Sequence, residues 1–445
     1  MNNGAAWTGR GATTALAGGV ELRWRALTVT VAPSLVHHQN LPVPVSGAAA
    51  PDLSPLAYPW QPMDWPQRHG WNPFWTLEAG QSRVAARYRG AVAGLSTENL
   101  WWGPSRRYAL VLSSTAPGFP HAFVRTARPV ATPIGELRAE AVWGRLSESD
   151  HFDGDPSNDH RPFGGLVIAL EPRAVPGLRL GLARTWIAPA SRDPGPVGRL
   201  VSPLLGYRPG DAAAASPRSP GDLRILGLFA RWAFPRSGFE AYAEWAMQGP
   251  WPGVDGFLRV PGRSRAFTLG AQKVVAAGAG HAVRLAGEIS STGLGSDALR
   301  NPRIDPPSFY AGGDGGGGRQ GYTHRGQLLG AWIGPGADAQ HVAADLLAPW
   351  GELGLFLERV RYDGDAYLRL WSPVFHSYGY DVELGGGLRQ RVVRGDIALG
   401  WTLGYLERFN RGFVEHRGNY HDPVAERGWS LELEAVWRVG VGIRP

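Results

Sequence analysis

The chain has 445 residues, of which 43% are hydrophobic and 19% charged, a composition typical of folding proteins and not of disordered ones. It has a formal net charge of +7 and no cysteine, so disulfides, thiolate metal sites and cysteine nucleophiles are excluded. Its basic residues, all arginine except Lys273, form no run of five, which argues against nucleic acid as a partner. No run of about 18 apolar residues occurs, so only a β-barrel could carry this chain across a membrane.

The first residues lack the features of an export signal. Met1 to Gly4 contains no basic residue, and Gly11 to Val20 is too small and polar for the apolar centre of a signal peptide. Strand-like sequence follows almost at once. We therefore expect the natural start of the protein, with its signal, to lie upstream of Met1.

Alternating polarity predicts β-strands along most of the chain. Apolar side chains occupy every second position in the segments 239–245, 283–289, 397–405 and 431–439. Arginine and glutamate recur on the polar face of these strands, which the dry core of a soluble β-sandwich would not tolerate. The pattern favours a barrel with one face toward lipid and a polar interior, and 19 tryptophans suit its aromatic girdles.

Turn signals divide the strands into hairpins. Short turns are expected at 25–26, 89–90, 172–177, 234–238, 276–280 and 393–395, and long Gly/Pro-rich connections at 41–72, 191–220 and 301–319. Such alternation is typical of outer-membrane barrels. We predict an all-β, transmembrane antiparallel β-barrel of about 18 strands, forming a single domain over residues 1–445, with a short helix at 337–347.

No sequence motif for catalysis or metal binding emerges. The glycine run 312–318 is not followed by Lys-Ser or Lys-Thr, so it predicts a loop and not a phosphate site. Asp153, Asp155 and Asp159 lack the spacing of a calcium loop. We expect no metal, no cofactor and no catalytic residue, and a protein that is not an enzyme.

A tryptophan-rich segment is the candidate for ligand binding. Residues 59–75 contain Trp60, Trp65, Trp71 and Trp75 among prolines. Aromatic rings stack on the apolar faces of sugars, so these residues predict a glycan site. The alternative is that they pack against one end of the barrel or form part of its girdle.

One stretch resembles a known family. Glu98-Asn99-Leu100-Trp101-Trp102-Gly103-Pro104 continues through Leu110 to Ser114 and ends in Ala116-Pro117-Gly118-Phe119-Pro120. This is similar to the pattern of the Wzi family of capsule assembly proteins, which has a Trp-Gly-Pro turn, a strand with two asparagines and an Ala-Pro-Gly-Phe-Pro turn. Ser113-Ser114-Thr115 replaces the asparagines here, which puts their hydrogen bonds in question.

A second stretch resembles the same family. Gly321 to Gln327, followed by 329–330 and 333–336, is similar to its Tyr-x-His-x-Gly element, and Trp143 to Ser149 fits between the two patches. Gly-Pro and Pro-Gly pairs set turns, so we interpret the motif residues mainly as framework. These residues are Trp101, Trp102, Gly103, Pro104, Arg106, Pro117, Gly118, Tyr322, His324, Arg325, Gly326, Gly330 and Gly334. We expect Arg106, Arg125 and Arg325 to line the lumen opposite Glu98 or Glu140.

The resemblance implies an 18-stranded outer-membrane barrel with minor helical segments at the periplasmic end. It also implies a lectin-like role, in which a monomer amid outer-membrane lipid and lipopolysaccharide anchors capsular or other surface polysaccharide. Two rivals stay open: a porin or transport channel, and a membrane hydrolase with a catalytic cluster at one barrel end. Bulky residues that fill the lumen would favour the lectin, and a continuous polar channel would favour the porin.

Overall fold

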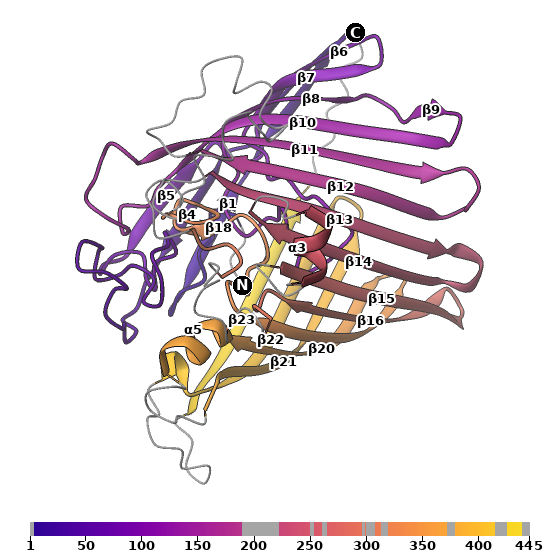
Figure 1. Cartoon of the computed structure of the whole chain (residues 1–445). Coiled ribbons are helices and arrows are strands. Elements are labelled where there is room, and N and C mark those ends of the chain that lie inside the picture. The colour runs from indigo at the N-terminus through magenta and orange to yellow at the C-terminus, as the bar shows by residue number, and fades with distance from the viewer. Residues whose placement is uncertain are drawn as a thin grey trace.

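The computed structural model describes residues 4–188, 222–249, 253–259, 265–295, 299, 308–312, 319–371, 379–413 and 425–437. Eighteen strands of these residues form one antiparallel sheet that curves into a barrel (Figure 1), as the alternation predicted. The first part of the sheet contains β2 (Val20–Trp24), β3 (Leu27–Val31), β6 (Arg83–Tyr88), β7 (Ala91–Ser96), β8 (His121–Thr126), β9 (Val130–Thr132), β10 (Gly135–Ser147), β11 (His160–Pro172) and β12 (Leu178–Ile187). The second part contains β13 (Leu223–Phe234), β14 (Phe239–Gln248), β15 (Arg265–Gly278), β16 (His281–Ser291), β19 (Asp338–Ala348), β20 (Gly351–Tyr362), β21 (Asp381–Arg394), β22 (Ile397–Phe409) and β23 (Ala425–Trp437).

Short turns and long connections alternate along the barrel, at opposite ends of the strands. All six predicted short turns are confirmed, including the two-residue turn between Trp24 and Leu27 and the one between Tyr88 and Ala91. The predicted long connection 41–72 is also found. Residues 191–220 lie outside the described residues, as do most of 301–319, including nearly all of the glycine run 312–318.

The predicted helix at 337–347 is wrong, because this segment is strand β19. Its residues pair with β16 on one side and with β20 on the other. Alanine, which is frequent here, favours helix only weakly, and two flanking backbone ladders outweigh that preference. Asp345 and Leu346 point to opposite faces of the sheet, as strand geometry requires.

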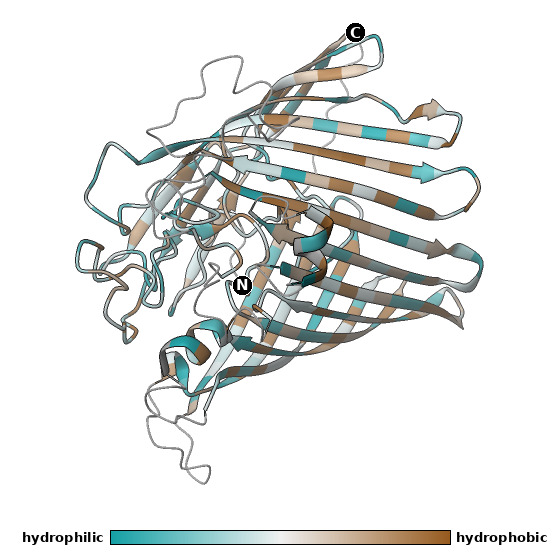
Figure 2. Ribbon diagram, in the orientation of Figure 1, coloured by the Kyte–Doolittle hydropathy of each residue, from teal (hydrophilic) through white to brown (hydrophobic). Residues whose placement is uncertain are grey.

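Apolar side chains cover the outward face of the barrel. Large exposed hydrophobic residues alternate with small or polar ones along the strands (Figure 2), for example Leu353, Leu355 and Leu357 on β20, and Leu431, Leu433 and Trp437 on β23. Carboxylates on the inward face, such as those of Glu244, Glu288 and Asp345, are buried. An apolar exterior around a polar interior is the inverse of a soluble protein and requires a lipid surround.

A second, three-stranded sheet extends the barrel wall. It contains β1 (Thr13–Ala17), β4 (Ser34–His38) and β5 (Phe74–Glu78), in the order β1-β4-β5. These strands continue β2, β3 and β6 beyond a kink at which Gly80 has a φ of +61°. A Cβ atom on Gly80 would lie 2.2 Å from the Ala32 carbonyl oxygen, so the kink needs glycine at this position.

Short helical segments lie in the long connections. Helix α3 (Gly253–Arg259) joins β14 to β15, and α5 (Gly364–Ala366) with η2 (Tyr367–Trp371) joins β20 to β21. Short turns face the periplasm in bacterial barrels. The long connections, with α3, α5 and η2, therefore lie at the outer end, whereas the 3-10 helix η1 (Pro235–Ser237) lies in a short turn at the periplasmic end, where the resemblance placed minor helical segments. Within the described residues, no helix combines the length and the apolar character needed to cross a membrane.

Candidate functional site

The connection between β7 and β8, residues 97–120, folds into the barrel instead of projecting from it. Tyr108, Leu110 and Leu112 in this segment have at most 1% of their surface exposed. Trp102 packs against Gly165 of β11, where a Cβ atom would lie 2.6 Å from the indole ring. We call residues 97–120 the luminal segment, since they occupy the interior between opposite walls of the barrel.

Two buried glutamates of the wall hold the backbone of the luminal segment. Glu288 of β16 accepts hydrogen bonds of 2.7 to 3.1 Å from three successive N–H groups, those of Arg106, Arg107 and Tyr108. Glu244 of β14 accepts bonds of 2.8 and 2.9 Å from the N–H groups of Ser105 and Leu110. The carboxylates thereby provide hydrogen-bond acceptors for backbone N–H groups that lie outside any sheet or helix.

The arginines of the luminal segment pair with further wall carboxylates. The Arg107 guanidinium forms a two-pronged ion pair with Glu358 of β20, and the Tyr108 hydroxyl also donates to that carboxylate. Arg106 lies 3.3 Å from Glu240 of β14, and not opposite Glu98 or Glu140 as predicted. Burial and the Glu358 carboxylate together hold the pKa of Tyr108 above its ordinary value, so the phenol stays a hydrogen-bond donor.

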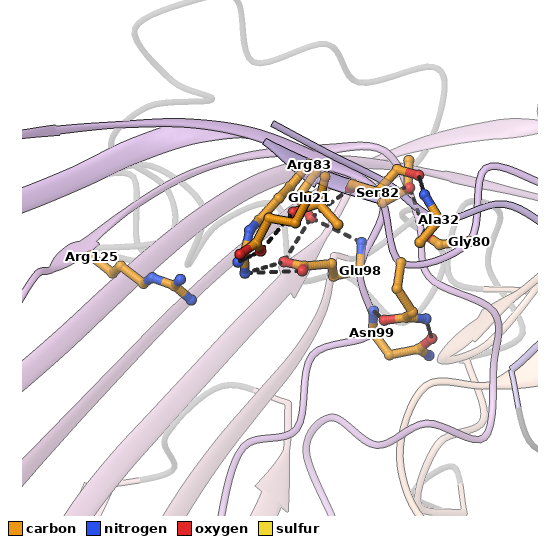
Figure 3. A network of polar contacts seen from close by, with 12 residues as sticks. Glu21, Ala32, Gly80, Ser82, Arg83, Glu98, Asn99 and Arg125 are labelled. Atoms are coloured by element: carbon orange, nitrogen blue, oxygen red, sulfur yellow. Dashed lines mark hydrogen bonds and ion pairs between the residues drawn. The ribbon is translucent and has the colours of Figure 1, made fainter. Parts of the chain in front are cut away.

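A polar network fixes the point at which the luminal segment leaves the wall. Arg83 of β6 bridges Glu98 at 3.1 Å and Glu21 of β2 at 3.1 Å (Figure 3). Arg125, also shown there, pairs with Glu140 at 3.7 Å, which confirms one of the predicted luminal ion pairs. The Arg83 contacts join the start of the segment to β6 and, through Arg83, to β2.

The second motif stretch, in the connection from β16 to β19, packs directly on the luminal segment. It contains the short strands β17 (Thr323–His324) and β18 (Gln327–Leu328). The Ser113 hydroxyl donates to the Gly330 carbonyl oxygen at 2.7 Å, and the Ser113 N–H group donates to Leu329 at 2.8 Å. Serine in place of the expected asparagine therefore still provides a hydrogen bond between the two stretches.

The glycines of both stretches lie at positions that leave no room for a side chain. Gly103 has a φ of +119°, and a Cβ atom there would lie 2.2 Å from the Glu244 carboxylate. A Cβ atom on Gly118 would lie 1.9 Å from the Thr97 carbonyl oxygen, and one on Gly330 would lie 2.5 Å from that of Leu110. Pro104 and Pro117 flank two of these turns, so this group serves as framework.

Two further framework residues, Gly326 and His324, form hydrogen bonds with distant parts of the chain. Gly326, with a φ of +73°, donates its N–H group to Asp64 at 3.2 Å, and Ser149 donates its own at 2.9 Å. The His324 ring accepts a hydrogen bond of 2.9 Å from the Ser147 N–H group, and burial lowers the pKa of His324 to about 3. An imidazole that must accept a backbone hydrogen bond is held in its neutral form.

A pocket of about 450 Å³ opens beside this framework, at the end of the barrel with the long connections. It is lined, among others, by His69, Trp71, Glu148, Asp150, His151 and Arg325. Arg325 forms an ion pair with Glu78 of β5, which also lines the pocket. Burial raises the pKa of Glu148 to about 8 and lowers that of His69 to about 3, so both side chains favour their uncharged forms.

The four candidate tryptophans lie in two different environments. Trp71 is 58% exposed, lines the pocket and has the Arg68 guanidinium 5.5 Å from its ring centre. Trp75 borders the pocket, but its ring packs 4.6 Å from that of His37 on the face of β5 opposite Phe74. Trp60 and Trp65 pack on aromatic neighbours next to the core.

Sequence reasoning did not identify the polar part of the pocket. His69, Glu148, Asp150 and His151 carry no motif spacing, and they come from two connections that lie far apart in the chain. The one sequence feature that could have pointed to Glu148 is its place in the stretch 143–149, which fits between the two motif patches. Asp153 accepts a hydrogen bond of 2.8 Å from the Asp155 N–H group, as in a simple turn.

No protein-family model matches the chain, and no curated protein matches its sequence. Among solved structures, it is similar to Wzi of Escherichia coli, an outer membrane protein involved in group 1 capsule assembly and a carbohydrate-binding β-barrel. The identity is 12%, the TM-score is 0.60, and the match covers 95% of this chain and 78% of Wzi.

Two Pseudomonas aeruginosa proteins match less well. For OccK5 (OpdH) the identity is 10% and the TM-score 0.42, over 95% of this chain and 92% of that protein. For OccK2 (OpdF), solved in complex with glucuronate, the identity is 10% and the TM-score 0.42, over 96% and 90%. With its apolar outward face and its likeness to Wzi, the chain has the fold of an outer-membrane β-barrel.

Proposed function

We propose that the protein is a non-catalytic, monomeric lectin of the outer membrane that anchors capsular or related surface polysaccharide, in the manner of Wzi-type capsule assembly proteins. The observation that carries the proposal is the pocket at the outer end of the barrel, with the exposed ring of Trp71 beside several polar side chains. Stacking on an aromatic face combined with hydrogen bonds to carboxylates and imidazoles suits a sugar ring, which has apolar faces and a polar edge.

The filled interior supports a binding role over a transport role. The luminal segment is anchored to β14, β16 and β20 by Glu244, Glu288 and Glu358, and its core residues are buried. A channel needs a continuous water-filled path, whereas these contacts join opposite walls through the middle of the barrel. We therefore expect low ion conductance from the wild-type barrel in planar bilayers.

The test is glycan-array binding by the barrel purified in detergent. Saturable binding to capsular or lipopolysaccharide glycans is expected, with loss of binding in Trp71→Ala. Trp429→Ala is the matched control, because Trp429 is exposed on β23, away from the pocket, and its loss leaves the pocket intact. The size distribution of the bound polysaccharide should stay unchanged on prolonged incubation. Steady ion conductance without glycan binding would instead favour the channel, and shortening of the polysaccharide would favour the hydrolase.

A further inference from the structure

The outer pocket contains more carboxyl groups than cations. Glu78, Glu148 and Asp150 line it, whereas Arg325 is the one arginine or lysine among its described lining residues. The Arg325 guanidinium is already paired with Glu78. Asp150 is exposed at the pocket. A ligand carboxylate that entered would meet Asp150 and find no cation free to neutralise it, which is unfavourable.

The lining histidines do not supply the missing positive charge. Burial lowers the pKa of His38, His69 and His151, in each case as the largest effect. Each imidazole is therefore neutral near pH 7 and acts as a hydrogen-bonding group. Arg68, below Trp71, donates to backbone oxygens of Asn40 and Trp71 and does not line the pocket.

The wall of the pocket has hydrogen-bonding capacity that the protein does not use. Three lining residues carry buried atoms without a partner, namely Nε2 of His38, Nε2 of His69 and Oε1 of Gln327. His38 and Gln327 are only 1% and 4% exposed. Buried polar atoms are nearly always paired in folded proteins, so unpaired ones in a pocket wall point to a ligand. A sugar hydroxyl both donates and accepts, and so matches either an imidazole nitrogen or an amide oxygen.

From this charge balance and these unpaired atoms, we infer that the pocket binds a glycan segment without negative charge, made of neutral or amino sugars, and discriminates against uronic acids. The inference rests on the proposed function and names the substrate class of the same site. One sugar ring stacks on Trp71, and its hydroxyl groups bond to the histidine and glutamine atoms of the wall. Asp150 accepts from a hydroxyl or an ammonium group and repels a carboxylate.

The experiment compares three sets of oligosaccharides of equal length by calorimetric titration of the detergent-purified barrel. The sets are neutral mannan fragments, amino-sugar chitosan fragments and acidic polygalacturonate fragments. We expect neutral or amino fragments to bind at least about tenfold more tightly than acidic ones. Asp150→Asn should reduce this affinity ratio several-fold. Asp155→Asn, the same change outside the pocket in the same connection, should leave the ratio unchanged.

Each alternative result has a separate meaning. Tightest binding of the acidic fragments, lost in Trp71→Ala, would overturn the charge selectivity and leave the lectin function standing. Binding that Trp71→Ala does not affect would remove the site from this pocket and would also overturn the inference. If no fragment of any set binds and the glycan array is equally blank, the proposed function itself is wrong.

Discussion

The Tyr322 hydroxyl group donates a hydrogen bond of 2.8 Å to the carbonyl oxygen of Val111, which lies 211 positions earlier in the chain. Tyr322 is fully buried and also lies 3.0 Å from the Thr185 hydroxyl of β12. This single side chain therefore joins the two motif stretches to each other and to the barrel wall. The two stretches therefore lie together in the folded barrel and hydrogen-bond to each other.

Tyr322→Phe should lower the free energy of unfolding by about 1–3 kcal/mol, because the Val111 carbonyl group would stay buried without its donor. Tyr322→Ala should cost about 3–5 kcal/mol, because it also leaves a cavity. Thermal unfolding in detergent measures both changes. Tyr88→Phe is the control, since Tyr88 is exposed on β6. An unfolding temperature equal to that of the wild type in Tyr322→Phe would contradict this role.

Glu288→Ala should loosen the luminal segment, because three N–H groups and the Tyr242 hydroxyl would lose their shared acceptor. We expect the variant to show larger and more variable ion conductance in planar bilayers than the wild type. Glu432→Ala, at a solvent-exposed position of β23, should conduct like the wild type. Equal conductance in all three proteins would mean that Glu288 does not hold the lumen shut.

Gly103→Ala should destabilise the barrel by about 1–3 kcal/mol, because the new methyl group would collide with Glu244 and the backbone φ of +119° disfavours any side chain. Gly18→Ala serves as the control, since a Cβ atom at Gly18 meets no other atom within 4 Å. Urea unfolding of both variants in detergent gives the comparison. A loss of stability that is the same at both positions would argue against a specific clash.

His324 should make the barrel sensitive to acid. Burial, with the nearby charges of Arg325 and Arg161, lowers the pKa of His324 from 6.5 to about 3. Between these two pKa values, His324 binds a proton in the unfolded chain but stays neutral in the folded chain. The stabilising contribution is complete above pH 6.5 and falls away as the pH drops from 6.5 toward 3.

Unfolding free energies measured across this pH range should slope less steeply in His324→Asn than in the wild type. His160→Asn, which alters an exposed histidine at the start of β11, should keep the wild-type slope. If both variants follow the wild-type curve, the acid sensitivity has another source.

Most of the barrel could be predicted from the sequence because it follows local rules. Alternation of apolar and polar residues depends on the period of the strand, and tight turns depend on a few residues around positions such as Arg25 and Arg89. The helix predicted at 337–347 is wrong because pairing with β16 and β20 outweighs the helix propensity of the alanines. A single sequence does not reveal which strands will lie beside a segment. Local sequence patterns also do not predict whether a long connection, such as residues 97–120, folds into the barrel or projects from it.

The candidate site was predictable only in part, for the same reason. Trp60, Trp65, Trp71 and Trp75 have similar sequence surroundings, but Trp71 alone both lines the pocket and stands free of aromatic neighbours described here. Their difference depends on which partners the rest of the chain brings near them. The pocket combines residues around positions 38, 70, 150 and 325, and no spacing rule connects segments so far apart.

The anchoring of the luminal segment also constrains the order in which the protein assembles. The segment belongs to the first third of the chain, but Arg107 pairs with Glu358, 251 positions later. A nascent barrel that adds hairpins in chain order would hold this arginine uncompensated until β20 arrives. Contacts of such long sequence separation slow folding, so seating of the segment and completion of the wall become one late, cooperative step. A chain that ended before β20 would lack Glu358, the partner of Arg107. The luminal segment would then lose one of its anchors to the wall in addition to the missing strands.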